Sequence, residues 1–73
     1  MIVNQFISIK LQDKSITELT LEIIDLMTGS VELTGSGGAF NSEHRDYDIQ
    51  ASTEQELDNF LDILTTKGYN YIG

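Results

Sequence analysis

The chain has 73 residues, no cysteine, and 12 acidic against 4 basic side chains, so its formal net charge is −8. This length is typical of one domain spanning residues 1–73, and the lack of cysteine excludes disulfides and thiolate zinc sites. The charge argues against direct binding to nucleic acid or to an anionic membrane, because both begin with Lys and Arg neutralising phosphates.

No targeting segment is evident in the sequence. Met1 to Phe6 lacks the basic start and the long apolar run of a signal peptide. No stretch approaches the roughly 20 consecutive apolar residues that cross a bilayer as a helix. We therefore expect a soluble protein of the reducing cytoplasm.

The first element predicted from the N-terminus is a strand over Ile2 to Leu11. Apolar and polar residues alternate along it, which places Val3, Ile7 and Ile9 on one face of a sheet. A polar turn over residues 12–15 follows.

Two structures fit the next segment, residues 16–27. Ser15 followed by Glu18 is typical of a capping box, and the apolar residues after it have helical spacing. The same residues also alternate with period two and are rich in Ile and Thr, which favours a strand. Because a tight hairpin fits the glycine that follows, we predict two antiparallel strands over Thr17 to Met27 and Ser30 to Thr34. In the alternative, a helix over 16–27 gives the β-α-β-β-α-β order of ferredoxin-like folds.

A glycine-rich run begins at Gly35, and we predict an irregular loop from there to about Arg45. The run lacks the Lys and the Ser or Thr that end a phosphate-binding loop, so we assign it no nucleotide site. Alternation returns over Arg45 to Ala51, which predicts a strand, and Tyr69 to Ile72 predicts a short closing strand.

The segment between these two strands is predicted to be a helix, residues 53–67. Thr53 and Glu56 form a second capping box, and Gly68 suits the left-handed residue that ends a helix. The residues with helical spacing that form its apolar stripe are Leu57, Phe60, Leu61 and Leu64. Together these elements predict an α+β domain, a small antiparallel sheet of four to five strands with this helix packed on one face.

The sequence offers no set of residues typical of an enzyme. His44 is the single histidine; it lies in the predicted loop next to acidic residues, but without the spacing of a metal site. Ser42 lies two residues before it, without the spacing of a nucleophile elbow. We therefore expect no catalytic residue, no cofactor and no metal ion.

Acidic residues on the outer side of the predicted helix are the main functional candidates. Glu54, Asp58 and Asp62 are four residues apart, so their side chains line up about 5–6 Å from one another and repel. An ordinary solvated helix face also fits these residues. The repulsion within the row and the acidic surplus of the whole chain favour a role in binding. Tyrosines that are exposed are expected to add apolar contacts, but the core is at least as good a place for Tyr47 and for one of Tyr69 and Tyr71. The expected partner-binding residues are this row, the acids near it and one Phe of the glycine-rich run: Glu54, Asp58, Asp62, Glu56, Asp46, Asp48 and Phe40.

These features predict a small acidic protein-binding module, an inhibitor that docks on a basic surface of a partner and blocks it. We expect that surface to bind nucleic acid, because a stiff row of carboxylates can imitate a track of phosphates. In size, charge and lack of cysteine the chain resembles the phage-encoded inhibitors of host defence nucleases, such as anti-CRISPR proteins. The resemblance implies a viral protein that acts in the host-cell cytoplasm.

The alternative function is a self-associating regulatory domain of the ACT type, which binds a small ligand. The order strand-helix-strand with Lys67 to Tyr71 at its end is similar to the way such domains close. The first half of the chain departs from that pattern, because it lacks the Pro-Gly that usually opens their first helix. This alternative predicts a homodimer.

Overall fold

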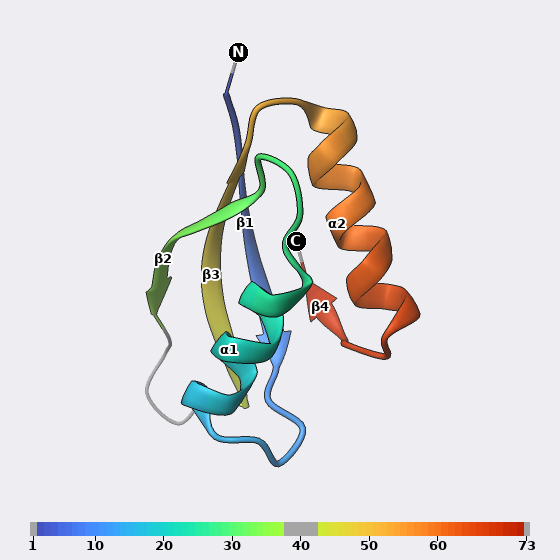
Figure 1. Cartoon of the computed structure of the whole chain (residues 1–73). Coiled ribbons are helices and arrows are strands. Elements are labelled where there is room, and N and C mark those ends of the chain that lie inside the picture. The colour runs from blue at the N-terminus through green and yellow to red at the C-terminus, as the bar shows by residue number, and fades with distance from the viewer. Residues whose placement is uncertain (1, 38–42, 73) are drawn as a thin grey trace.

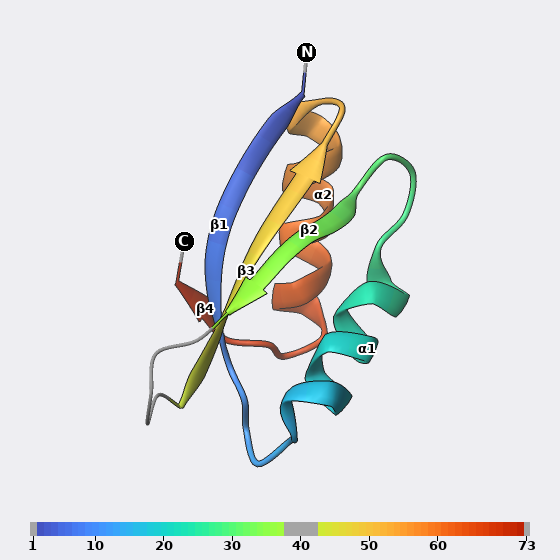
Figure 2. The same ribbon diagram turned by 90° about the vertical axis from the view of Figure 1, so that its left-hand side faces the viewer.

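Two helices and a four-stranded antiparallel sheet make up residues 2–37 and 43–72, the part of the chain that the computed structural model describes. The strands lie in the sheet in the order β2-β3-β1-β4 (Figure 1). Both helices cover the same face of that sheet (Figure 2), and the predicted α+β class is confirmed. In chain order the elements are β1 Val3–Lys10, α1 Ile16–Leu26, β2 Glu32–Gly37, β3 His44–Ala51, α2 Glu54–Thr66 and β4 Tyr71–Ile72.

The neighbouring strands β1 and β3 form the centre of the sheet and supply most of its buried face. They pair antiparallel along their full lengths. Ile7, Ile9, Tyr47 and Ile49 are fully buried beneath the helices, and the residues between them face the other side. The alternation in the sequence predicted both strands and their buried faces correctly.

Residues 16–26 form a helix, so the predicted strand over Thr17 to Met27 is wrong and the alternative helix is confirmed. Ser15 caps this helix, since its hydroxyl accepts a hydrogen bond from the Glu18 amide at 3.1 Å. Leu19 and Ile23, one turn apart, are fully buried, whereas Leu21 is 62% exposed. A strand would have placed these three side chains on one face. The segment packs on the sheet through one helical stripe, and this packing selects the helical spacing over the period-two alternation of a strand.

The strand β2 begins and ends later than the predicted strand over Ser30 to Thr34, and it pairs with β3. It therefore includes Gly35 and Gly37, so the loop predicted from Gly35 to Arg45 is wrong at its start, while residues 38–42 lie outside the described part. A shift in register between Leu33 and Gly35 marks a bulge. A Cβ at Gly35 would lie 3.2 Å from Asp48 Oδ2, so glycine permits this close pairing.

The helix α2 has the predicted limits, with Thr53 as its first cap and Lys67 as its last. The Thr53 hydroxyl accepts a hydrogen bond from the Glu56 amide at 3.2 Å. Gly68 has a φ of +90°, and the chain leaves the helix there. The side chains of α2 that are buried in the core are Leu57, Phe60 and Leu64. Neither α1 nor α2 has the length and apolar character of a membrane-spanning helix.

The last strand, β4, is shorter than the strand predicted over Tyr69 to Ile72. It pairs antiparallel with β1 at two positions, where Ser8 lies opposite Ile72 and Ile9 opposite Tyr71. The other face of the sheet, away from the helices, carries the outward side chains of all four strands, because the helices lie on one side only (Figure 2).

Candidate functional site

An exposed flank of α2, beside its buried stripe, carries a row of three carboxylates, which we call the α2 row: Glu54, Asp58 and Asp62. All three are exposed, and they follow one another at intervals of about one helical turn. Among the hydrogen bonds and ion pairs between described residues, none involves these side chains. The buried stripe of the helix is held in the core, so the row stands on a fixed support.

Glu56 lies on a different side of α2 and has a structural role. Its carboxylate accepts hydrogen bonds from the Ser30 hydroxyl and from the Ser30 amide, the latter at 3.0 Å. These two bonds, the hydroxyl first, hold the pKa of Glu56 below its ordinary value of 4.5. The Ser30 hydroxyl oxygen also accepts a bond from the Ser52 amide at 2.8 Å. Glu56 therefore ties α2 to the connection between α1 and β2.

Asp46 and Asp48 lie across the sheet from the α2 row. They alternate along β3 with the buried Tyr47 and Ile49, so they belong to the outer face, away from the helices. Asp46 accepts a hydrogen bond from the Ser8 hydroxyl on the neighbouring strand. The structure thus brings three of the seven predicted residues together and sets Glu56, Asp46 and Asp48 apart from them. Phe40 lies outside the described residues.

Few of these carboxylates are neutralised by the chain's own cations. An ion pair joins Lys14 Nζ to Glu22 Oε1 at 2.5 Å. Arg45 instead donates to the Ser36 hydroxyl at 3.2 Å, and Lys10 and Lys67 are exposed. Most of the acidic excess therefore remains available to a partner.

A polar network that the sequence did not predict joins α1 to the connection between β1 and α1 and to the connection between α2 and β4. Glu22 Oε1 accepts hydrogen bonds from Lys14 Nζ and from Tyr69 Oη, both at 2.5 Å. Lys14 Nζ also lies 5.4 Å from the centre of the Tyr69 ring. The bonds from Lys14 and Tyr69 lower the pKa of Glu22, while burial and then the bond to Glu22 raise the pKa of Tyr69 to about 12. No local spacing indicates this network, because its members are far apart in the sequence.

Tyr47 has the core position that the sequence allowed for it, and Tyr69 and Tyr71 are half-buried. Tyr47 is fully buried, and its hydroxyl shares a 2.8 Å hydrogen bond with that of Thr20. Tyr69 belongs to the network with Glu22, and Tyr71 packs against the core. Tyr47 on β3 and Tyr71 on β4 have the inward register, so their rings face the helices.

Other apolar side chains are exposed instead. On the outer face of the sheet, Phe6 is 55% exposed and Ile72 is 68% exposed. The alternation along β1 could have indicated Phe6, because it shares the outward register with polar residues. On α1 the exposed apolar side chains are Ile16, Leu21 and Ile24.

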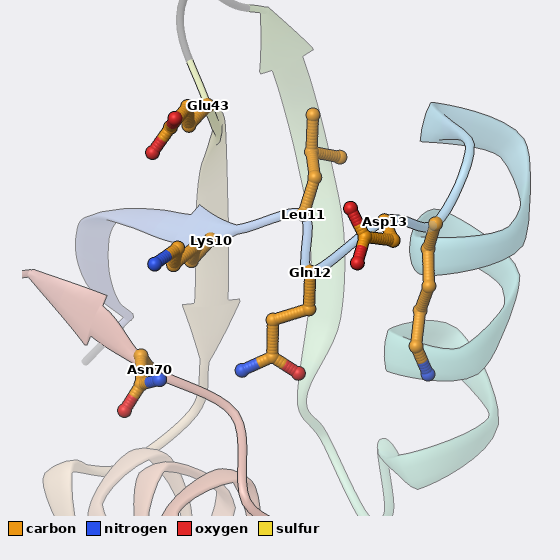
Figure 3. A pocket seen from close by; sticks show the side chains of 7 residues that line it. Lys10, Leu11, Gln12, Asp13, Glu43 and Asn70 are labelled. Carbon is orange, nitrogen blue, oxygen red and sulfur yellow. The ribbon is translucent and has the colours of Figure 1, made fainter.

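An open hollow of about 660 Å³ lies beyond the end of β1 (Figure 3). Gln12 and Asp13 form its turn with φ values of 54° and 67°, in the left-handed region that residues other than glycine rarely adopt. The Lys14 amide closes that turn by donating to the Leu11 carbonyl at 3.1 Å. The lining carries charges of both signs: Lys10, Leu11, Gln12, Asp13, Lys14, Glu43 and Asn70.

His44 begins β3, where Lys10 lies opposite it on β1. In the described part of the chain no group of three or more His, Cys, Asp and Glu side chains could hold a metal ion. Ser42, the other residue weighed for catalysis, lies outside that part.

Comparison with protein-family models, with curated proteins and with solved structures found no match to this chain. No relative therefore suggests a role for any of these residues.

Proposed function

We propose that the protein is an acidic protein-binding module that docks on a basic surface of a partner and blocks the binding of nucleic acid there. The observation that carries this proposal is the α2 row, three exposed carboxylates without a partner among the described residues, on a helix fixed in the core. The proposal also assigns this binding to the cytoplasm, because disulfides are rare there and this chain has no cysteine to form one.

The energetics of the row support a role in binding. Like charges one helical turn apart destabilise a helix by a few tenths of a kcal/mol per pair, roughly, so the repulsion within the row works against the fold. A basic partner would relieve that repulsion and would be drawn in from a distance, because the net charge of −8 raises the rate of encounter with a positive surface. A line of negative charge on a stiff support also resembles a nucleic-acid backbone to such a surface.

The proposal is tested by capturing partners from a bacterial lysate on immobilised protein and measuring the affinity of the purified partner. The expected variant is Asp58→Lys with Asp62→Lys, which reverses two charges of the row. Its matched control is Asp25→Lys with Glu43→Lys, which makes the same change in net charge at exposed positions elsewhere.

We expect the row variant to weaken binding by at least about tenfold and the control to stay within about threefold of wild type. Binding should also weaken steeply as salt rises, and duplex DNA should compete with the protein for the partner. Equal losses of affinity in the two variants would show that net charge alone, and not the α2 row, determines binding. Unchanged affinity in the row variant would contradict the proposal.

A second candidate, the self-associating regulatory domain of the ACT type, is favoured by one observation. The second half of the chain has the strand-helix-strand order β3-α2-β4 on which that resemblance rested. The exposed apolar side chains of α1 offer such a dimer a contact surface, and the hollow in Figure 3 offers a place for a small ligand with charges of both signs. Light scattering at high protein concentration and thermal unfolding with added amino acids separate the two candidates. A protein that stays monomeric and that no amino acid stabilises against heat would rule out the ACT-type domain.

A further inference from the structure

Backbone groups along β1 point alternately to its two neighbours. The Leu11 amide donates to the Glu43 carbonyl on the β3 side, and the Lys10 amide donates to the Asn70 carbonyl on the β4 side, each at 2.9 Å. Because this alternation has a period of two, the even-numbered residues of β1 direct their N–H and C=O groups toward β4. Asn4 and Phe6 belong to this set.

β4 is too short to reach these groups. It pairs only with Ser8 and Ile9, so over residues 2–37 and 43–72 no strand lies beside residues 3–7 of β1 on this side. The Phe6 carbonyl receives one long contact, 3.4 Å from the side-chain amide of Gln5. The N–H and C=O groups of Asn4 and Phe6 therefore form a free sheet edge, which can pair with another extended segment. We call residues 3–7 the β1 edge.

Apolar side chains border the β1 edge on the outer face of the sheet. Phe6 lies on that face, and Ile72 extends it from β4, where it pairs with Ser8. Ile2 is 60% exposed on the same register of the strand. A segment added at the edge would cover these side chains with every second residue.

The α2 row borders the β1 edge on the inner face. Glu54 and Val3 line one hollow of about 430 Å³, and the N-terminal halves of α2 and β1 lie at the same end of the molecule (Figure 1). Glu56 faces Ser30 on the α1 side of the helix. Glu54 and Asp58, each two residues from Glu56, are turned by about 200° to the other flank. That flank is the one on the side of β1 and β4.

The repeat distances of the row and of a strand agree. Four residues of helix rise about 6 Å, which is the step between Glu54, Asp58 and Asp62 along the axis. Two residues of an extended strand rise about 6.6–6.8 Å, which is the step between side chains on one face. A strand beside β1 with a cation at every second position could thus set its cations against successive carboxylates of the row.

The charge of this chain points to the occupant. A second copy cannot supply alternating cations, because no two of Lys10, Lys14, Arg45 and Lys67 are two residues apart. We propose that the β1 edge accepts an extended basic segment of the partner as an added antiparallel strand. Its Lys or Arg residues meet the α2 row and the residues between them cover Phe6 and Ile72. This inference rests on the proposed function and names the part of the partner that is bound.

The probe is a synthetic peptide of four Lys-Val repeats, measured against a peptide of the same composition with all Lys before all Val. We expect the alternating peptide to bind at least about tenfold more tightly, because only that order separates the two faces of a strand. No binding of the alternating peptide, or equal binding of both, would overturn the inference.

Methylation of peptide amides tests the strand itself. In an antiparallel pair, the residues opposite Asn4 and Phe6 share their outward face and direct their amides at β1. Peptides methylated at every Val amide should therefore lose binding by about tenfold or more, while peptides methylated at every Lys amide should keep it. Equal effects of the two methylations would overturn the added strand.

A variant of the protein gives the matching result from the other side. Asn4→Pro removes an amide that faces the free edge and leaves the bonds to β3 in place, and Asn4→Ala is its control. We expect Asn4→Pro to lower the affinity for the alternating peptide by at least about fivefold, and Asn4→Ala to change that affinity by less than about twofold. Should Asn4→Pro fail to fold, the methylated peptides decide alone.

The charge variant separates this inference from the proposed function. If Asp58→Lys with Asp62→Lys lowers the affinity for the peptide and methylation has no effect, the inference of an added strand is wrong and the proposed role of the α2 row is supported. If methylation acts as expected and the charge variant does not, the strand binds without the row, and the basic occupant proposed here is wrong.

Discussion

The two helices begin alike and differ in what they show to the solvent. Each starts at a hydroxyl residue, Ser15 or Thr53, that accepts a hydrogen bond from the amide three residues on. Each buries one stripe against the sheet. The exposed side of α1 includes large apolar side chains, with Leu21 62% exposed, whereas the exposed side of α2 carries the α2 row.

The carboxylates on the two helices also fall into two groups, those that stabilise the fold and those that are free to bind a partner. Glu22 on α1 and Glu56 on α2 each accept two hydrogen bonds from distant parts of the chain, and both have lowered pKa values. The α2 row has no such bonds among the described residues. Acidic residues therefore have two roles in this protein. Those that are hydrogen-bonded within the chain stabilise the fold, and those without such bonds are available to a partner.

Truncating a side chain of the shared core should have the largest effect. Phe60 is 2% exposed, so Phe60→Ala should lower the free energy of unfolding by about 3–5 kcal/mol. Leu21→Ala, on the exposed side of α1, should change it by less than about 0.5 kcal/mol. Urea unfolding followed by circular dichroism measures both, and a comparable loss in the two variants would contradict the burial described.

How far the sequence predicts this fold is seen in the same two helices. α2 has a cap, a stripe of one period and a terminal glycine that agree, so its limits were correct. α1 fits two periods, and only the packing of Leu19 and Ile23 on the sheet selects the helix. Local pattern does not contain that contact.

The candidate site shows the same limit. The spacing of Glu54, Asp58 and Asp62 predicted a row, and they do form one, because helical spacing is local. The partner of Glu56 is Ser30, which is 26 residues away, and the sheet separates Asp46 and Asp48 from the row. Such long-range placement depends on strand order, which the sequence left open.

The Glu22 network should have the next largest effect, and it acts at high pH. Because the folded-state pKa of Tyr69 is raised from 10 to about 12, its contribution to stability is present below pH 10 and is lost as pH rises through about 12. Tyr69→Phe should remove this pH-dependent part of the unfolding free energy. In Glu22→Gln, NMR titration should show the Tyr69 pKa closer to 10, and an unchanged value would contradict the network.

Glu56 should have a smaller effect with the opposite sign in pH. Its folded-state pKa lies below 4.5, so its contribution is present above pH 4.5 and is lost as pH falls through the lowered value. Glu56→Gln should lower the melting temperature at neutral pH, and the gap to wild type should close in acid. Glu54→Gln is the matched control, since Glu54 has no such bonds; an equal gap there would refute the role of Ser30.

The α2 row itself should give the smallest change in stability, and a gain. Asp58→Asn removes the repulsion from both neighbours in the row, so the melting temperature should rise by about 1–3 °C. The gain should shrink when salt is added, because exposed charges are screened. A loss of stability would show that Asp58 has a favourable partner within the chain.

The most direct test of the account compares the two helices during binding. The captured partner is added to isotope-labelled protein while amide NMR signals are followed residue by residue. We expect the shifts to concentrate at Glu54, Asp58 and Asp62 and at the β1 edge, and to leave the amides of Leu21 and Ile24 on α1 unchanged. Shifts centred on α1, with the α2 row unaffected, would contradict the claim that the free carboxylates form the binding surface.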